Sequence, residues 1–185
     1  TAPRLAADLG MPVFVKPANM GSSIGVSRAD TVDEIDAALV HAFSYDEVAG
    51  VEEAVEGREI EVAVLGDLEP RASVPGEIVP SREFYDYEDK YEGDGAELLV
   101  PAPLDDAAAA TVRALAIDVF RALRCSGMAR VDFFYEERGR ARGFLCNEIN
   151  TIPGFTPISM YPKLWQASGV AYPELIDELV GLALA

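Results

Sequence analysis

The chain has 185 residues, of which half are hydrophobic and a quarter are charged, as expected for one sizeable globular domain or two small ones. Its 15 basic and 32 acidic residues leave a formal net charge of −17, which argues against a nucleic-acid-binding surface. No apolar run reaches the roughly 18 residues of a membrane span, and the first residues lack the apolar core of a signal peptide. We therefore expect a cytoplasmic protein that binds neither nucleic acid nor membranes.

Histidine and cysteine are scarce in the sequence. The single histidine, His41, and the two cysteines, Cys125 and Cys146, argue against a His-rich zinc site, a histidine-based triad and a disulfide framework. His41 falls within a helical pattern, so we expect a structural role for it. We expect both cysteines to be buried thiols.

Local patterns in the first half of the chain predict helices alternating with strands. In chain order, the patterns predict a helix at 2–9 that ends at Gly10, a strand at 12–17, a small-residue loop at 18–25, a helix at 31–43, a strand with a connector at 50–57, and strands at 58–66 and 72–80. The helix at 31–43 starts with a capping box, in which Glu34 returns to Thr31.

The second half begins with a long polar and aromatic loop at 81–97, of a length that usually signals function. An amphipathic helix follows at 105–124, with its apolar positions at Val112, Leu115, Val119 and Leu123. The remaining predicted elements are strands at 128–137 and 143–150 and short helices near 160–168 and 173–184.

Polar side chains interrupt the last two predicted strands. Side chains alternate along a strand, so Arg130 and Asp132 share one face, as do Cys146, Glu148 and Asn150. A hairpin whose paired residue numbers sum to about 280 sets Asp132 opposite Glu148 and Arg130 opposite Asn150, provided that its loop has an odd length.

Like charges opposite each other on a sheet are unfavourable, and a hard cation would remove the conflict. Carboxylate and amide oxygens without histidine or cysteine favour Mg²⁺ or Mn²⁺, with Asp132, Glu148 and Asn150 as the ligands. The alternative is that Arg130 neutralises both acids in an ion-pair network.

The segment GSSIG at 21–25 is suited to binding phosphate. Its glycines allow close approach, Ser22 and Ser23 add hydroxyl donors, and Lys16 on the preceding strand could reach a phosphate. Neither GxxxxGK[ST] nor GxGxxG occurs, so P-loop and Rossmann folds are disfavoured. A plain surface turn is the alternative.

Five segments in order, PVFVKPANMGSSIGV, EGREIEVAVLG, FYDYEDKY, ARVDFF and NEINTIPGFTPISMYPKLW, resemble the D-alanine–D-alanine ligases of the ATP-grasp superfamily. The resemblance covers nearly the whole chain. It implies an α+β fold of mainly antiparallel sheets flanked by helices, with ATP in the cleft between two subdomains. Residues 1–55 would be the second half of the central ATP-grasp subdomain, and residues 56–185 the carboxy-terminal domain that carries the metal and substrate sites.

The resemblance also implies an activity and its nucleotide-binding residues. The activity is an ATP- and Mg²⁺-dependent ligation of two D-alanines through an acyl phosphate, which makes D-alanyl-D-alanine for peptidoglycan. The nucleotide-binding residues would be Lys16 at the phosphates, Ser22 and Ser23 in the closing loop, Glu52, Ala54 and Val55 at adenine, Glu59 at the ribose, and Lys90 on a mobile loop that also faces the substrate.

The remaining implied roles are catalytic. Arg130 would stabilise the transferring phosphoryl group, with Ser22 and Tyr91 also among the catalytic residues, and the Gly154 N–H would be an oxyanion donor. Ser159 would bind the carboxylate of the second D-alanine. Two Mg²⁺ or Mn²⁺ ions would be held by Asp132, Glu148 and Asn150.

The chain departs from the family in length. The family's amino-terminal domain and the first half of its central domain have no counterpart, so we expect a piece of a longer protein that is inactive alone. We expect the longer protein to be a homodimer acting on ATP and D-alanine. The alternatives are a ligase making D-alanyl-D-lactate or D-alanyl-D-serine, a non-catalytic ATP-binding module, and an α+β domain with a salt-bridged hairpin. Tyr91 is typical of the dipeptide-forming members.

Overall fold

The computed structural model describes residues 2–80, 97–156 and 158–184, and these form two compact units. The first unit runs up to Val55, and the second comprises Glu56–Val79 and the residues from Glu97 onward. The long loop predicted at 81–97 lies outside the described residues, apart from Glu97. Within the described ranges, none of the helices combines the length and apolarity that crossing a membrane requires.

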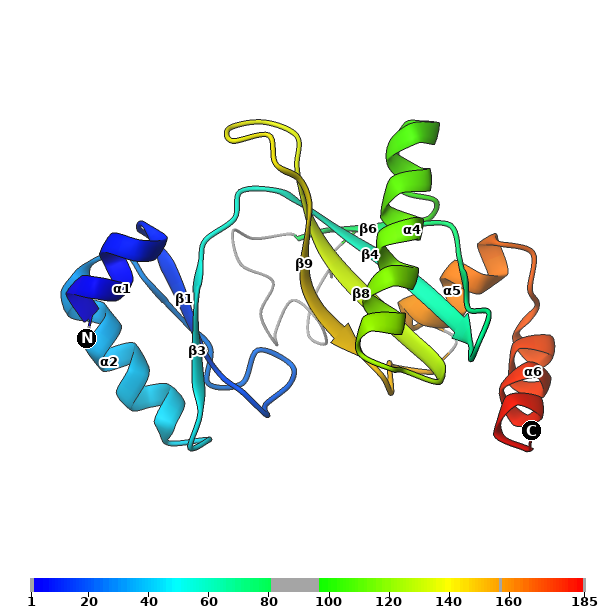
Figure 1. Ribbon diagram of the computed structural model, residues 1–185, viewed down its shortest axis with the longest axis horizontal. Coiled ribbons are helices and arrows are strands. Elements are labelled where there is room, and N and C mark those ends of the chain that lie inside the picture. Colours follow the sequence, from blue (N-terminus) through cyan, green and yellow to red (C-terminus); the bar gives the residue numbers. More distant parts are fainter. Residues whose placement is uncertain (1, 81–96, 157, 185) are drawn as a thin grey trace. The chain divides into compact units, whose positions relative to one another are not determined.

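The first unit is a three-stranded antiparallel sheet with helices on one face (Figure 1). Its elements are α1 (Ala2–Leu9), β1 (Val13–Pro17), β2 (Ser27–Ala29), α2 (Val32–Phe43) and β3 (Ala49–Glu53), with strand order β2-β1-β3. Val13 and Val15 of β1 are fully buried among residues of α1 and α2. Because side chains alternate, Lys16 lies on the face of β1 that the helices leave uncovered.

The predicted elements of the first unit form, and β2 is an additional strand. The Glu34 carboxylate accepts a hydrogen bond from the Thr31 backbone N–H at 3.2 Å, as a capping box requires. Gly10 takes a positive φ of 81° directly after α1, where the sequence predicts the helix to end.

The second unit is built on a six-stranded antiparallel sheet. Its elements are β4 (Arg58–Gly66), β5 (Arg71–Ala72), β6 (Gly76–Val79), β7 (Glu97–Leu99), α4 (Asp106–Ala122), β8 (Gly127–Glu136), β9 (Gly143–Asn150), α5 (Met160–Ala167) and α6 (Tyr172–Leu184). The strand order is β7-β6-β4-β8-β9, and β5 pairs with β4. Figure 1 shows β8 and β9 as a hairpin beside β4.

The helix α4 covers one face of this sheet with three of the four predicted apolar residues, because Val112 is buried and Leu115 and Val119 pack against the same core. Its buried residues are Val112, Ala116 and Phe120. Leu123 is 60% exposed, so the expectation for that residue is wrong. Spacing of four residues places Ala116 and Phe120 in line with Val112, and the small alanine lets the helix approach the sheet closely.

The helix α5 covers the opposite face of the sheet at Gly76. A Cβ atom on Gly76 would lie 2.6 Å from Met160 Cε and 2.8 Å from Leu164 Cδ2, so α5 packs directly on this glycine. The buried Tyr161 hydroxyl donates to the Val64 carbonyl at 3.0 Å and ties α5 to β4. The pKa of Tyr161 is raised above its ordinary value, chiefly by burial.

Two other expectations need correction. The strand predicted at 72–80 is divided into β5 and β6, because the buried Ser73 hydroxyl accepts a hydrogen bond from the Ala63 N–H at 3.0 Å and interrupts the ladder. Cys125 is only half-buried and Cys146 is exposed, so the prediction of two buried thiols is wrong.

Candidate functional site

Three acidic residues form a row across β4, β8 and β9, which we call the carboxylate row. Glu61 pairs with Asp132, and Asp132 pairs with Glu148. Arg130 and Asn150 face each other two residues away along β8 and β9. Since directly paired residues project from the same face, all five side chains share one face of the sheet. The two pairs predicted for the hairpin are confirmed.

A β-bulge at Asn147 produces this register. Near the loop, Glu136 pairs with Gly143 and Phe133 with Cys146, so these residue numbers sum to 279 rather than 280. The register shifts between Asp132 and Phe133, and Asn147 is the extra residue. The expected odd loop length is therefore wrong, and the bulge supplies the missing residue.

The bulge also changes the position of Cys146. Uninterrupted alternation placed Cys146 on the face of Glu148, but Cys146 pairs with Phe133 instead. The pKa of the Cys146 thiol is raised by partial burial and then by the charges of Asp132 and Glu148. The thiol therefore lies within the electrostatic field of the carboxylate row.

Arg130 lies between two carboxylates. Its Nε donates to Asp132 Oδ1 at 2.7 Å and its Nη2 donates to Asp132 Oδ2 at 2.6 Å. Glu61 Oε2 lies 3.2 Å from the same Nε, and the Glu61 side chain is only 7% exposed. Burial alone would lower the pKa of Arg130, but Asp132, Glu61 and Glu148 together raise it. The guanidinium is permanently charged and held on two sides.

The Asn150 amide links the other two members of the predicted metal site. Its Nδ2 donates to Asp132 Oδ2 at 3.0 Å and to Glu148 Oε1 at 3.2 Å. In this arrangement Arg130 forms an ion pair with Asp132, one of the two acids that it would neutralise in the ion-pair alternative. The same amide can turn its oxygen inward, which would give two carboxylates and one amide oxygen, a donor set suited to Mg²⁺ or Mn²⁺.

A purely acidic metal site is not present in the part of the chain that the structure describes. There, no three Asp, Glu, His or Cys side chains are grouped to hold a metal ion. A cation at this position therefore depends on the Asn150 oxygen and on ligands from outside the chain. The donor chemistry fits such a shared site.

Gly154 and Ser159 lie together on the loop that follows β9. A Cβ atom on Gly154 would lie 3.0 Å from Ser159 Oγ, so the glycine permits this approach. The Thr156 N–H donates to Ser159 Oγ at 3.0 Å, and the Thr156 and Ser159 hydroxyls are 2.9 Å apart. Ser159 is also the residue that precedes α5. Gly154 and Ser159, two of the predicted substrate contacts, therefore lie close together.

In the first unit, Lys16 and Glu52 form an ion pair. Lys16 Nζ lies 2.7 Å from Glu52 Oε1, and both side chains are partly exposed. Ala54 donates its N–H to the Pro12 carbonyl at 3.1 Å, so Ala54 and Val55 continue from β3 along the start of β1. Glu59 lies in the second unit, on β4, where it pairs with Phe134 and Ile78.

The glycine-serine loop has an unusual backbone. Ser22 and Ser23 take φ values of 54° and 59°, a region that side chains other than glycine rarely adopt. Asp46 anchors the start of the loop, because its Oδ2 accepts the Asn19 backbone and side-chain N–H groups, each at 2.7 Å. A hydrogen bond from the Val48 N–H, and then these bonds from Asn19, lower the pKa of Asp46. Strained backbone of this kind is often found at ligand-binding loops.

Three further residues bear on the candidate site: two that the structure does not describe and one that sequence reasoning did not identify. Lys90 and Tyr91 lie outside the described residues. Glu61 was missed by sequence reasoning, although a glutamate between Ile60 and Val62 in an apolar strand was a usable signal. Its partner strand β8 lies about 70 residues away, and local patterns do not give that pairing.

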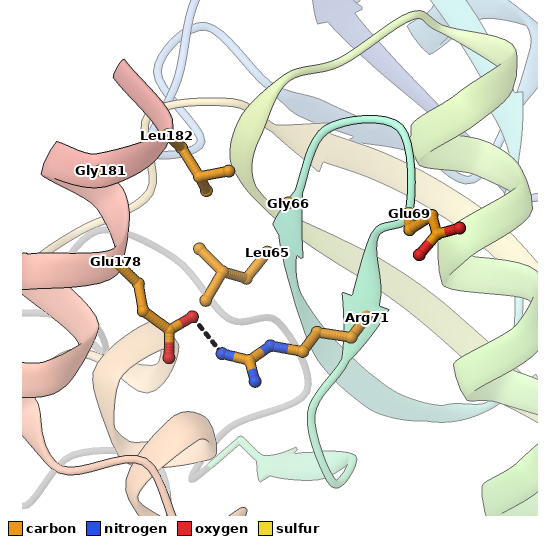
Figure 2. A pocket seen from close by; sticks show the side chains of 7 residues that line it. All are labelled: Leu65, Gly66, Glu69, Arg71, Glu178, Gly181 and Leu182. Carbon is orange, nitrogen blue, oxygen red and sulfur yellow. Dashed lines mark hydrogen bonds and ion pairs between the residues drawn. The ribbon is translucent and has the colours of Figure 1, made fainter. Parts of the chain in front are cut away.

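A cavity of about 380 Å³ lies elsewhere on the second unit (Figure 2). Its lining comprises Leu65, Gly66, Glu69, Arg71, Glu178, Gly181 and Leu182. The ion pair between Arg71 and Glu178 crosses it from β5 to α6. The lining includes none of the predicted site residues, so this cavity is separate from the carboxylate row.

The chain is similar to known proteins over nearly its whole length. The family described as "D-ala D-ala ligase C-terminus" matches residues 2–181. The D-alanine–D-alanine ligase B of Clostridium tetani is 53% identical over 172 residues, which are 93% of this chain and 48% of the relative. The D-alanine–D-alanine ligase of Halothermothrix orenii is 56% identical over 95% of this chain and 50% of its own length.

Two solved structures are similar. The D-alanine–D-alanine ligase of Coxiella burnetii superposes with a TM-score of 0.82 at 40% identity, over 99% of this chain and 48% of that protein. The VanG D-Ala:D-Ser ligase of Enterococcus faecalis gives 0.86 at 37% identity, over 97% and 52%. They confirm the expected ATP-grasp fold. The chain spans about half the length of the relatives that it matches.

Proposed function

Because the chain belongs to the family of D-alanine–D-alanine ligase carboxy-terminal regions, we propose that it is part of an ATP-dependent ligase that joins two D-alanines. Residues 1–55 would be the second half of the central subdomain and residues 56–185 the carboxy-terminal domain. The longer protein would make D-alanyl-D-alanine for peptidoglycan in the cytoplasm, act as a homodimer, and be inactive when only this chain is present.

The observation that carries the proposal is the shared face of Arg130, Asp132, Glu148 and Asn150. A guanidinium beside oxygen donors for cations is suited to phosphoryl transfer, because that reaction depends on positioning and on neutralisation of charge. We propose that Asp132, Glu148 and Asn150 hold two Mg²⁺ or Mn²⁺ ions. Such ions, when bound, neutralise the charge of the phosphate oxygens of ATP.

We propose that the first unit and the start of β4 bind ATP. Lys16 would release Glu52 and contact the phosphates, while the backbone of the loop at Ser22 and Ser23 would donate hydrogen bonds to them. Glu52, Ala54 and Val55 would contact adenine and Glu59 the ribose, with Lys90 contributing from its loop.

In the first step, a carboxylate oxygen of the first D-alanine would form a bond to the γ-phosphorus of ATP. The bond between that phosphorus and the β,γ-bridging oxygen would break, and ADP would leave. Arg130 would neutralise the phosphoryl oxygens, with Ser22 and Tyr91 assisting. Each preorganised donor of this kind typically contributes about 10²–10³ in rate.

In the second step, the amine of the second D-alanine would attack the carbonyl carbon of the acyl phosphate. The Gly154 N–H would donate to the developing oxyanion, and Ser159 would bind the attacking amino acid through its carboxylate. Phosphate would then leave with the electrons of the C–O bond, and the amine would lose a proton. Lys90 and Tyr91 would belong to a loop that keeps water from the acyl phosphate.

Phosphate release from ATP by the full-length protein tests the proposal, with D-alanine, D-lactate and D-serine offered as second substrates. D-Alanine alone should support release and yield D-alanyl-D-alanine. Release that requires D-serine would favour the D-alanyl-D-serine alternative, to which the VanG likeness points. Binding of ATP without release under any condition would favour a non-catalytic module.

A further inference from the structure

Glu61 has a contact that the proposed ligase function does not use. Its Oε2 lies 3.2 Å from Arg130 Nε, the same nitrogen that donates to Asp132 Oδ1 at 2.7 Å. Glu61 and Asp132 are paired on adjacent strands, so Arg130 has a carboxylate on each side. One guanidinium is therefore shared between a residue assigned to metal binding and one without an assigned role.

Asp132 is heavily occupied in this arrangement. Its two oxygens accept hydrogen bonds from Arg130 at 2.7 and 2.6 Å, and Oδ2 also accepts from Asn150 at 3.0 Å. A carboxylate has about four lone-pair sites, so little capacity remains for a cation. Metal binding at Asp132 requires Arg130 to give up part of this contact. A buried guanidinium that loses one anion is stable only if another carboxylate stays beside it.

Glu61 is held where it can be that second carboxylate. It is almost fully buried, and it lies on the central strand β4 between β6 and β8. Its paired residue on β6 is Gly76, on which Met160 and Leu164 pack. This packing excludes solvent on that side and limits the directions in which the Glu61 side chain can turn.

We propose that Glu61 is a positioning residue that holds the Arg130 guanidinium while Asp132 binds a divalent cation. This inference rests on the proposed function, because it assumes that Asp132 is a metal ligand. Arg130 would move from Asp132 toward Glu61 and remain on the same face of the sheet, beside the residues that would hold the cation. Glu61 itself would contact neither the cation nor the nucleotide.

Mn²⁺ binding to the full-length protein, measured by the relaxation of water protons, tests the inference without a need for turnover. Glu61→Gln keeps the shape of the side chain and removes its charge, so Arg130 should remain on Asp132. We expect Mn²⁺ affinity to fall about 10–100-fold, as for other residues that orient a metal ligand. The matched control is Glu136→Gln at the end of β8, which removes an equally buried carboxylate that pairs with Arg142 and should leave Mn²⁺ affinity within about twofold.

The Arg130→Met background separates positioning from simple electrostatic attraction. Without Arg130 nothing needs to be drawn away from Asp132, so adding Glu61→Gln should change Mn²⁺ affinity by less than about threefold. The double variant removes both members of the ion pair, so this comparison can still be made if Glu61→Gln alone does not fold. A direct charge effect of Glu61 would give the same loss with and without Arg130.

Two results would overturn the inference while leaving the proposed metal site intact. One is a Glu61→Gln affinity equal to that of Glu136→Gln, and the other is an equal loss in both backgrounds. No Mn²⁺ binding by the unaltered protein would instead refute the metal site, and the inference with it.

Discussion

Removing the guanidinium of Arg130 should destabilise the second unit strongly. Arg130→Met keeps an apolar stem of similar length but leaves Glu61 and Asp132 side by side, with side chains only 7% and 13% exposed. Breaking a buried ion pair by removing one partner costs about 3–5 kcal/mol. We expect about 3 kcal/mol, the lower end, because Asn150 still donates to Asp132 and some solvent reaches it.

Urea unfolding measures this change, with the fluorescence of Trp165 as the probe. Trp165 is the only tryptophan in the sequence, and it is buried on α5 in the same unit. Arg138→Met, on the exposed hairpin loop, is the control and should change the free energy of unfolding by less than about 0.5 kcal/mol. A loss below about 1 kcal/mol at neutral pH would refute this account of the Arg130 contacts.

Three further predictions concern packing and pH. Gly76→Ala should lower the free energy of unfolding by about 1–3 kcal/mol, because its Cβ atom would meet buried Leu164 Cδ2 at 2.8 Å. Gly181→Ala, in open space within α6, should instead raise it by up to about 1 kcal/mol, and a loss there would contradict the helix geometry. Arg142 lowers the pKa of Glu136 from 4.5, so Glu136→Gln should be less stable than the unaltered chain above pH 4.5. That difference should vanish as the pH falls through the lowered pKa; a difference independent of pH in urea titrations would exclude the ion pair as its cause.

The hairpin of β8 and β9 shows how far local patterns reach. Alternation along each strand identified the facing pairs, because Asp132 and Glu148 stand out in apolar surroundings. The bulge at Asn147 was not predictable, since an even-length loop with one extra strand residue gives the same distant pairing as an odd-length loop with regular strands. The unexpected loop length and the bulge therefore compensate at Asp132 and Glu148, whereas the prediction for Cys146, which lies between the bulge and the loop, was wrong.

Contacts between distant segments were out of reach. Glu61 joins Asp132 only because β4 pairs with β8, and nothing in either strand alone specifies that partner. The last predicted core position of α4, Leu123, was misjudged for a related reason. Leucine predicts burial better than alanine does, yet the sheet beneath the helix selects Ala116 because it allows close approach, and it leaves Leu123 exposed.

The central claim is that Asp132, Glu148 and Asn150 bind divalent cations. The most direct measurement is an anomalous difference map from crystals of the full-length protein with Mn²⁺ and a non-hydrolysable ATP analogue. We predict anomalous peaks within about 2.0–2.6 Å of oxygens of these three side chains, with the Asn150 amide turned over. A map without such peaks, in which Arg130 still binds both oxygens of Asp132, would contradict the claim.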